Sequence, residues 1–158
     1  MKKINFLIKL KEEEKLQIVE PSENIKIAYL QKSAKSLSSA KALLDIGNLE
    51  DSVALAYYAM YHPLLALLFR VGIKCENHTA SIIMLKEVFE IDNSTISKAK
   101  AERVDKQYYV DFEVSKDETK EAIETAENFI AEMVDFIEKL NEEKINNFKD
   151  KAIELMSE

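Results

Sequence analysis

Glycine and proline are scarce in this chain, with only two residues of each among 158. Such a sequence has few residues with which to punctuate strands and hairpins, whereas Lys, Glu, Ala, Leu and Ile, which favour helix, supply most of the chain. The composition therefore predicts an all-α fold. Apolar residues make up 47% of the sequence, which is enough for one hydrophobic core, and we expect a single domain.

Cysteine and long apolar runs are scarce as well. Cys75 is the single cysteine, which excludes an intrachain disulfide. The apolar run at the N-terminus meets Lys9 before it reaches the length of a signal peptide. The most apolar stretch, residues 63–69, ends at Arg70 and is far shorter than the roughly 20 residues that a membrane span needs. We expect a cytoplasmic protein with no membrane role.

Few residues could bind a metal or form a phosphate-binding loop. Cys75 and His78 have the spacing of a metal-binding pair, but one cysteine and two histidines cannot complete a closed structural zinc site without carboxylates. Gly47 and Gly72 are isolated, so no glycine-rich phosphate loop is present. We expect no metal and no cofactor.

The net charge of −7 is unevenly distributed. Residues 113–158 contain fourteen Asp and Glu against six Lys, or −8, which leaves fifteen acids against sixteen bases, or +1, in residues 1–112. Phosphate binding depends on Lys and Arg. The part of the chain before residue 113 is therefore not electrostatically barred from RNA, although it contains no concentrated basic patch, and the acidic tail has the pattern of a solvated helix face.

Capping residues mark the expected helix boundaries. Ser22 is the predicted N-cap of a helix that runs to Gly47, which supplies the left-handed residue at its end. Asn48 is expected to cap a second helix, residues 49–71, which Gly72 ends. This second helix is apolar on almost every side, so it should be buried either within the bundle or against a second copy of the chain.

Further helices are predicted in the second half of the chain. A short helix begins near Asn77 or His78, and another follows residues 92–94. A capping box at residues 115–118 precedes a long helix whose apolar residues step by three and four positions as far as Leu140. Beyond Leu140 the stripe changes phase, so the helix either breaks there or continues and turns a second face toward another partner. We divide the chain into an N-terminal segment (1–21), a helical bundle (22–140) and a C-terminal helical extension (141–158).

The second helix contains the most chemically distinctive segment, residues 56–62, Ala-Tyr-Tyr-Ala-Met-Tyr-His. Tyr58 and His62 share one face of the helix, and Asp51 extends that line toward the helix start. A histidine titrates near neutrality and can act as a general acid or base, while tyrosine hydroxyls can orient a phosphate or ribose. The alternative is that these side chains belong to the core or an interface, where their polar tips find partners.

Pro63 directly follows His62. A proline inside a helix has no amide to donate, and it crowds the carbonyl group four residues earlier, here that of Ala59. We therefore predict a kink or a loosening of the helix immediately after the histidine.

Residues 22–140 resemble the HEPN domain, an all-helical family. The similarity rests on the tyrosine-histidine segment and on four further elements in the same order. The first is Leu44-Asp45-Ile46-Gly47 with Asp51-Ser52-Val53, and the second is Gly72-Ile73 followed by His78. The third consists of Arg103, Asp105 and Tyr108-Tyr109, and the fourth is the segment 114–118 with Ala126-Glu127-Asn128-Phe129. The resemblance implies an up-and-down bundle of four to five helices with a long C-terminal helix. It also implies a homodimer in which the histidine helices face a shared cleft. Toxin members of the family cut RNA with a histidine and an arginine, and a small nucleotidyltransferase acts as their antitoxin.

Carried over residue by residue, the resemblance makes His62 the candidate catalytic residue and matches Tyr58 and Tyr61 to aromatic positions of the family. Leu55 stands where the family has its arginine. Loss of a cation beside a scissile phosphate typically removes ~3 kcal/mol of transition-state stabilisation. Arg70 lies about two turns after His62 and could assist only from the other subunit.

The candidate ligand-binding residues are Asp51, Tyr58, Tyr61, His62, Arg70 and His78. We expect a homodimer that binds RNA or a nucleotide with weak cleavage or none, and no DNA. Two alternatives stay open. The protein could be an active, metal-independent endoribonuclease toxin with a nucleotidyltransferase antitoxin, or a scaffold that pairs with another protein.

Overall fold

The computed structural model describes residues 2–108 and 113–157. Tyr109 and the side chains of Asp105 and Tyr108, which contribute to the family resemblance, lie outside what it describes. The elements in chain order are α1 (Lys2–Glu12), β1 (Leu16–Ile18), α2 (Glu23–Asp45), α3 (Leu49–Val71), β2 (Ile73–Cys75), α4 (His78–Glu87), α5 (Ser94–Tyr108), α6 (Lys116–Glu138) and α7 (Glu142–Leu155). Helices predominate, which confirms the predicted all-α bundle.

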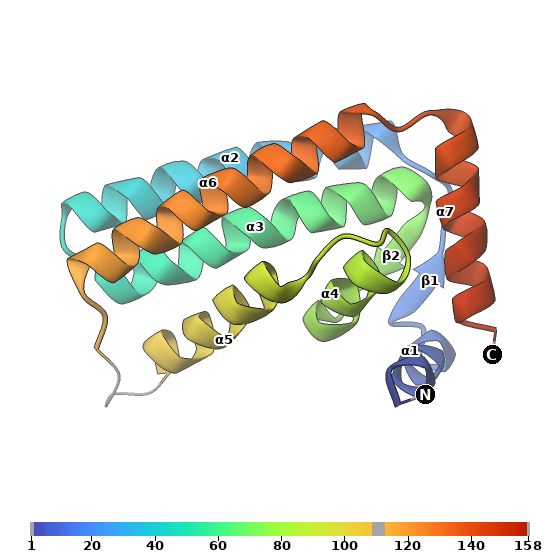
Figure 1. The fold of residues 1–158 in the computed structure, drawn as a ribbon, viewed down its shortest axis with the longest axis horizontal. Helices are drawn as coiled ribbons and strands as arrows, with labels where there is room; N and C mark the ends of the chain where they lie inside the picture. The colour runs from blue at the N-terminus through green and yellow to red at the C-terminus, as the bar shows by residue number, and fades with distance from the viewer. Residues whose placement is uncertain (1, 109–112, 158) are drawn as a thin grey trace.

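Helix α3 forms the centre of the bundle. Figure 1 shows α2, α3 and α6 lying lengthwise together, with α5 along another side of α3, and these helices are in contact. Fifteen residues of α3 are buried, so the nearly continuous apolar character of this helix is matched by neighbours within the chain. By length and composition α3 could also cross a membrane, but a buried central helix of a bundle has the same features.

The predicted caps of α2 and α3 are largely confirmed. The Ser22 side chain accepts a hydrogen bond from the Ile25 amide at 3.1 Å, and Gly47 and Gly72 take positive φ angles of 83° and 92° at the helix ends. Asn48 occupies the N-cap position of α3, but its side chain makes no capping hydrogen bond.

Helix α3 continues through Pro63 because α2 supplies the missing hydrogen bond. The Ser33 hydroxyl of α2 is buried and donates to the Ala59 carbonyl oxygen at 2.6 Å. That oxygen is the one that an amide at position 63 would normally pair with. The predicted loosening after His62 is thus met by a tertiary hydrogen bond, and the helix is unbroken from Leu49 to Val71.

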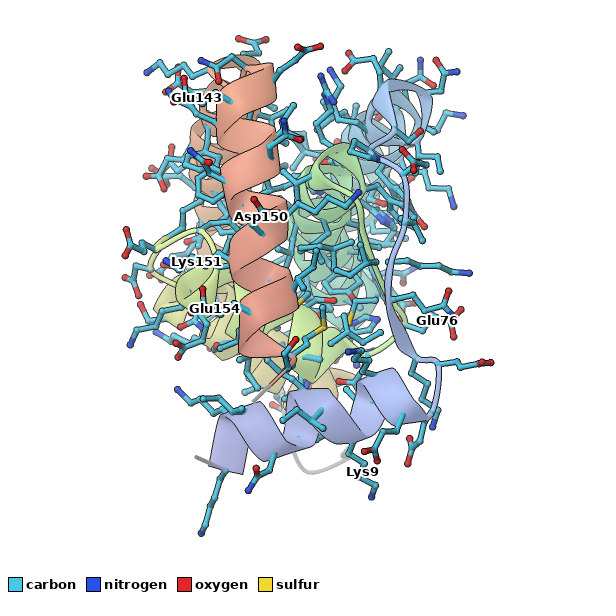
Figure 2. All side chains as sticks on the ribbon, turned by 90° about the vertical axis from the view of Figure 1, so that its right-hand side faces the viewer. Lys9, Glu76, Glu143, Asp150, Lys151 and Glu154 are labelled. Carbon is cyan, nitrogen blue, oxygen red and sulfur yellow. The ribbon has the colours of Figure 1, made fainter. Side chains whose placement is uncertain are left out.

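The N-terminal segment forms structure that the sequence did not predict. Strand β1 pairs with β2 in an antiparallel two-stranded sheet, with Leu16 opposite Cys75. Figure 2 shows α1 lying across this end of the bundle, crosswise to α7. The Glu76 amide donates to the Lys15 carbonyl at 2.9 Å, so the sheet holds the chain directly before α4.

The long helix that the sequence predicts after residues 115–118 breaks near Leu140. Helix α6 ends at Glu138, and Asn141 caps α7 by accepting from the Lys144 amide at 2.8 Å. Phe148 of α7 then packs against Phe89, with ring centroids 4.9 Å apart. The C-terminal extension therefore covers one end of its own bundle.

Candidate ligand-binding site

The tyrosine-histidine segment of α3 lies where this helix meets α2, α4 and α5. Because consecutive helical residues point in different directions, the segment divides into two sides. Tyr57 and Tyr61 are buried, with exposed fractions of 1% and 4%, and they contact α4. Tyr58 and His62 are half-buried.

His78, the first residue of α4, is held by both buried tyrosines. The Tyr57 hydroxyl lies 2.7 Å from His78 Nδ1, and the Tyr61 ring stacks on the imidazole with centroids 3.8 Å apart and an interplanar angle of 11°. Asn77 fixes the start of α4, since its side chain accepts from the Ala80 amide at 2.9 Å. The histidine is therefore positioned from both α3 and its own helix cap.

Tyr58 connects the two histidines of the chain. Its ring stacks against His62 at 6.1 Å and stands edge-on to His78, also at 6.1 Å. Tyr29 of α2 extends this row of rings on the other side of His62, at 5.9 Å, and in turn stacks on Phe69 at 5.6 Å. The fold thus gathers aromatic and imidazole rings from three helices into one row.

Arg103 of α5 brings a guanidinium group to the same place. Its Nη1 donates to the Tyr58 hydroxyl at 3.3 Å, and its Cζ lies 5.3 Å from the Tyr57 ring centroid and 5.5 Å from that of Tyr58. The sequence offers Arg103 only as part of the closing region, because it does not precede His62. In the fold, α5 brings this cation to Tyr57 and Tyr58 of α3.

The charges around the two imidazoles are positive. Burial lowers the pKa of His62, and the Lys32 ammonium lowers it further. Burial also lowers the pKa of His78, followed by the positive charges of Arg103 and Lys100 and by His62. Both rings are therefore neutral near pH 7 and stand among cations, an arrangement that attracts an anion such as phosphate.

One nitrogen of His62 is left without a partner. Its Nδ1 is buried and makes no hydrogen bond to any described residue. Buried polar atoms are nearly always paired, so this unpaired nitrogen needs an explanation, such as a catalytic role or an ordered water.

Two predicted site residues lie elsewhere. Asp51 is exposed in the first turn of α3, about 16 Å from His62 along the helix axis. Arg70 lies toward the other end of α3, where its Nε is 2.8 Å from a carboxylate oxygen of Glu23. Within one chain the structure therefore brings together Tyr58, Tyr61, His62 and His78, but neither Asp51 nor Arg70.

Cys75 has the surroundings of a small core residue. It is buried, its Sγ donates to the Asn77 carbonyl at 3.3 Å, and burial raises the pKa of its thiol. A metal-binding cysteine needs the thiolate, which this environment disfavours. Among the described residues no group of three or more His, Cys, Asp or Glu is placed to hold a metal ion.

A cavity of about 290 Å³ lies between α3, α5 and α6, with Tyr57 in its wall. Its lining includes the carboxylates of Glu102, Glu118 and Glu121 and one cation, Lys98. This acidic lining is unsuited to phosphate, so an anionic ligand is expected at the histidine cluster and not in the cavity.

Comparison with known proteins identifies a matching family and several relatives. The family model of the HEPN domain matches residues 27–145. A UPF0332 protein of Archaeoglobus fulgidus is 31% identical over 107 residues, which cover 64% of this chain and 86% of that protein. A protein of Methanocaldococcus jannaschii named as a candidate toxin is 26% identical over 113 residues, 72% of this chain and 84% of its own length. A UPF0332 protein of Pyrococcus horikoshii is 42% identical over 56 residues, only 35% of this chain and 39% of that protein.

Proposed function

Because the chain belongs to the HEPN domain family, we propose that it binds single-stranded RNA or a nucleotide at the cluster of Tyr58, His62, His78 and Arg103. The observation that carries this proposal is the position of the Arg103 guanidinium, which donates to the Tyr58 hydroxyl and lies over the rings of Tyr57 and Tyr58. A guanidinium binds phosphate oxygens with two parallel hydrogen bonds and keeps its charge at any physiological pH.

The remaining side chains of the cluster suit the other parts of a nucleotide. The half-buried ring of Tyr58, with its neighbours Tyr29 and His62, provides the aromatic surface on which bases stack in single-stranded RNA. Lys32 and Lys100 add positive charge on either side of this row. Cations together with aromatic rings are the usual means of binding single strands without strong sequence preference.

Arg103→Gln tests the proposal against a matched control. The sequence has only one other arginine, Arg70, so Arg70→Gln makes the same chemical change outside the cluster. Fluorescence anisotropy with a labelled single-stranded RNA should show affinity falling about tenfold or more for Arg103→Gln, since a charge-assisted hydrogen bond is worth roughly 1.5–3 kcal/mol. Arg70→Gln should bind more tightly than Arg103→Gln, because Arg70 lies outside the cluster within one chain. Equal weakening by both would argue against a phosphate site at the cluster.

Cleavage of RNA is the second candidate function. Two neutral imidazoles and a guanidinium around Tyr58 are groups that can move a proton and stabilise phosphate charge, and one relative is named as a candidate toxin. Incubation of single-stranded RNA with the wild type and with His62→Ala decides this point, because equal background cleavage by both removes the enzymatic function.

Partners belong to the same proposal. We expect a homodimer with the α3 helices of two copies close to a shared cleft, and a small nucleotidyltransferase as antitoxin if the protein is a toxin. Light scattering that gives a monomer of 18.1 kDa would remove the shared cleft. Absence of any binding to RNA or adenine nucleotides would leave a protein-interaction scaffold as the function to test.

A further inference from the structure

The hydrogen bond between Tyr57 and His78 determines which imidazole nitrogen carries the proton. Tyr57 is 1% exposed, and its hydroxyl oxygen lies 2.7 Å from Nδ1. A neutral imidazole has one nitrogen that donates and one that accepts, and the partner of one nitrogen fixes the role of both.

Nδ1 of His78 is the acceptor that the described residues offer to the hydroxyl proton of Tyr57. Burial raises the pKa of Tyr57, so the hydroxyl keeps its proton. Among the described residues Nδ1 is its only hydrogen-bond partner, and Arg103, whose guanidinium lies over its ring, has donors but no acceptor. A buried O–H without an acceptor is strongly disfavoured. The hydroxyl therefore donates, Nδ1 accepts, and the ring proton of His78 lies on Nε2.

We infer that Tyr57 is a positioning residue that holds His78 in the neutral Nε2–H tautomer, so that His78 offers a hydrogen-bond donor to a phosphate oxygen of the ligand. The tautomer follows from the structure of the free protein, whereas the donor role rests on the proposed function. Tyr61 fixes the plane of the imidazole by stacking, but its own hydroxyl is hydrogen-bonded to Ser81 at 3.1 Å. Tyr57 alone among the described tyrosines is hydrogen-bonded to a nitrogen of this ring.

The groups around the ring oppose its protonation. Arg103 and Lys100 act on it as positive charges, and His62 does so once it is itself protonated. A proton on Nδ1 would also reverse the hydrogen bond and leave the Tyr57 O–H without an acceptor among the described residues. His78 therefore serves as a fixed hydrogen-bond donor.

Nitrogen-15 NMR of histidine-labelled protein tests the tautomer directly. The chain has two histidines, so a His62→Gln variant assigns the signals of His78. We expect a pyridine-type Nδ1 and a pyrrole-type Nε2 in the wild type and in Tyr61→Phe, which keeps the stacked ring. Tyr57→Phe should give a mixture of tautomers. A pyrrole-type Nδ1 in the wild type overturns the inference, as does an unchanged spectrum in Tyr57→Phe, and the wild-type spectrum decides alone if that variant does not fold.

Binding of a labelled single-stranded RNA tests the donor role. Tyr57→Phe should lower the affinity by the reciprocal of the fraction of Nε2–H tautomer that NMR finds in that variant, about twofold for an even mixture, whereas Tyr61→Phe should bind like the wild type. Equal affinities of Tyr57→Phe and the wild type overturn the donor role. If the wild type binds no RNA, the proposed function fails, and the NMR result still decides on the tautomer.

Discussion

The hydrogen bond from Ser33 to the Ala59 carbonyl makes a sharp prediction about stability. The donor is 1% exposed, the distance is 2.6 Å, and Pro63 denies the acceptor its usual helical partner. Ser33→Ala therefore removes the hydroxyl donor from a buried carbonyl that has no amide at position 63 to replace it. An unsatisfied buried acceptor costs roughly 1–3 kcal/mol, and a loss of about 2 kcal/mol lowers Tm by roughly 4–8 °C in a chain of this length.

Ser33→Ala can be tested again in a protein that also carries Pro63→Ala. An alanine at position 63 has an amide that can donate to the Ala59 oxygen, so removal of the Ser33 hydroxyl should then cost less than about 1 kcal/mol. Urea unfolding of the wild type, both single variants and the double variant gives the coupling energy. The same cost of Ser33→Ala in both backgrounds would refute the proposed repair of the proline site.

Ser52→Ala is the matched control. The Ser52 hydroxyl is equally buried and donates to the Ala40 carbonyl at the same distance of 2.6 Å. That carbonyl lies inside α2, where an amide one turn later is available to it. Ser52→Ala should therefore destabilise the protein less than Ser33→Ala does.

Three further predictions concern helix ends and pH. Gly47→Ala should destabilise the protein by ~1 kcal/mol, because the glycine has a positive φ. Gly72→Ala should cost well over that, because its φ is also positive and a Cβ there would lie 2.5 Å from a backbone oxygen, whereas Gly47 has open space around it. Equal Tm shifts of the two variants would contradict this. Asn141→Ala should cost about 1 kcal/mol in urea unfolding and Asn48→Ala less, since only the former side chain caps its helix; the reverse order would contradict the cap geometry. The pKa of His62 lies below its ordinary 6.5, so the unfolded chain takes up the proton first and stability falls as pH drops below 6.5. His62→Gln should lose less stability over that range, and equal losses would argue that His62 is not the cause.

The helices that a local signal marks could be predicted from the sequence. Ser22, Gly47 and Gly72 bound α2 and α3 as expected, because caps and left-handed glycines act within one turn of the residue itself. The pairing of β1 with β2 could not be predicted, since two three-residue strands far apart in sequence leave no periodic pattern. The break before α7 does have a local signal, the N-cap Asn141, but the change of phase in the apolar stripe is equally compatible with a continuous helix.

Some residues of the candidate site could be predicted from the sequence and others could not. Tyr58, Tyr61 and His62 can be found from the sequence because they lie in one helix, and His78 because the family has a histidine in that region. Arg103 is missed, because its position in the sequence says nothing of how close α5 lies to α3. Asp51 extends a helix face, yet a shared face does not make residues three turns apart neighbours.

Helix α3 lacks two groups in its own sequence, and neighbouring helices bring groups of the same kind close to it. Pro63 removes an amide, and Ser33 of α2 donates to the carbonyl that loses it. Leu55 provides no cation, and Arg103 of α5 lies against Tyr58. Both groups act through distance, because a carbonyl needs a donor within hydrogen-bond reach and a phosphate needs a charge within a few ångströms, whichever helix carries it. The absence of an arginine before His62 is therefore weak evidence against phosphate chemistry in this chain, and the affinity of Arg103→Gln for RNA is the measurement that decides it.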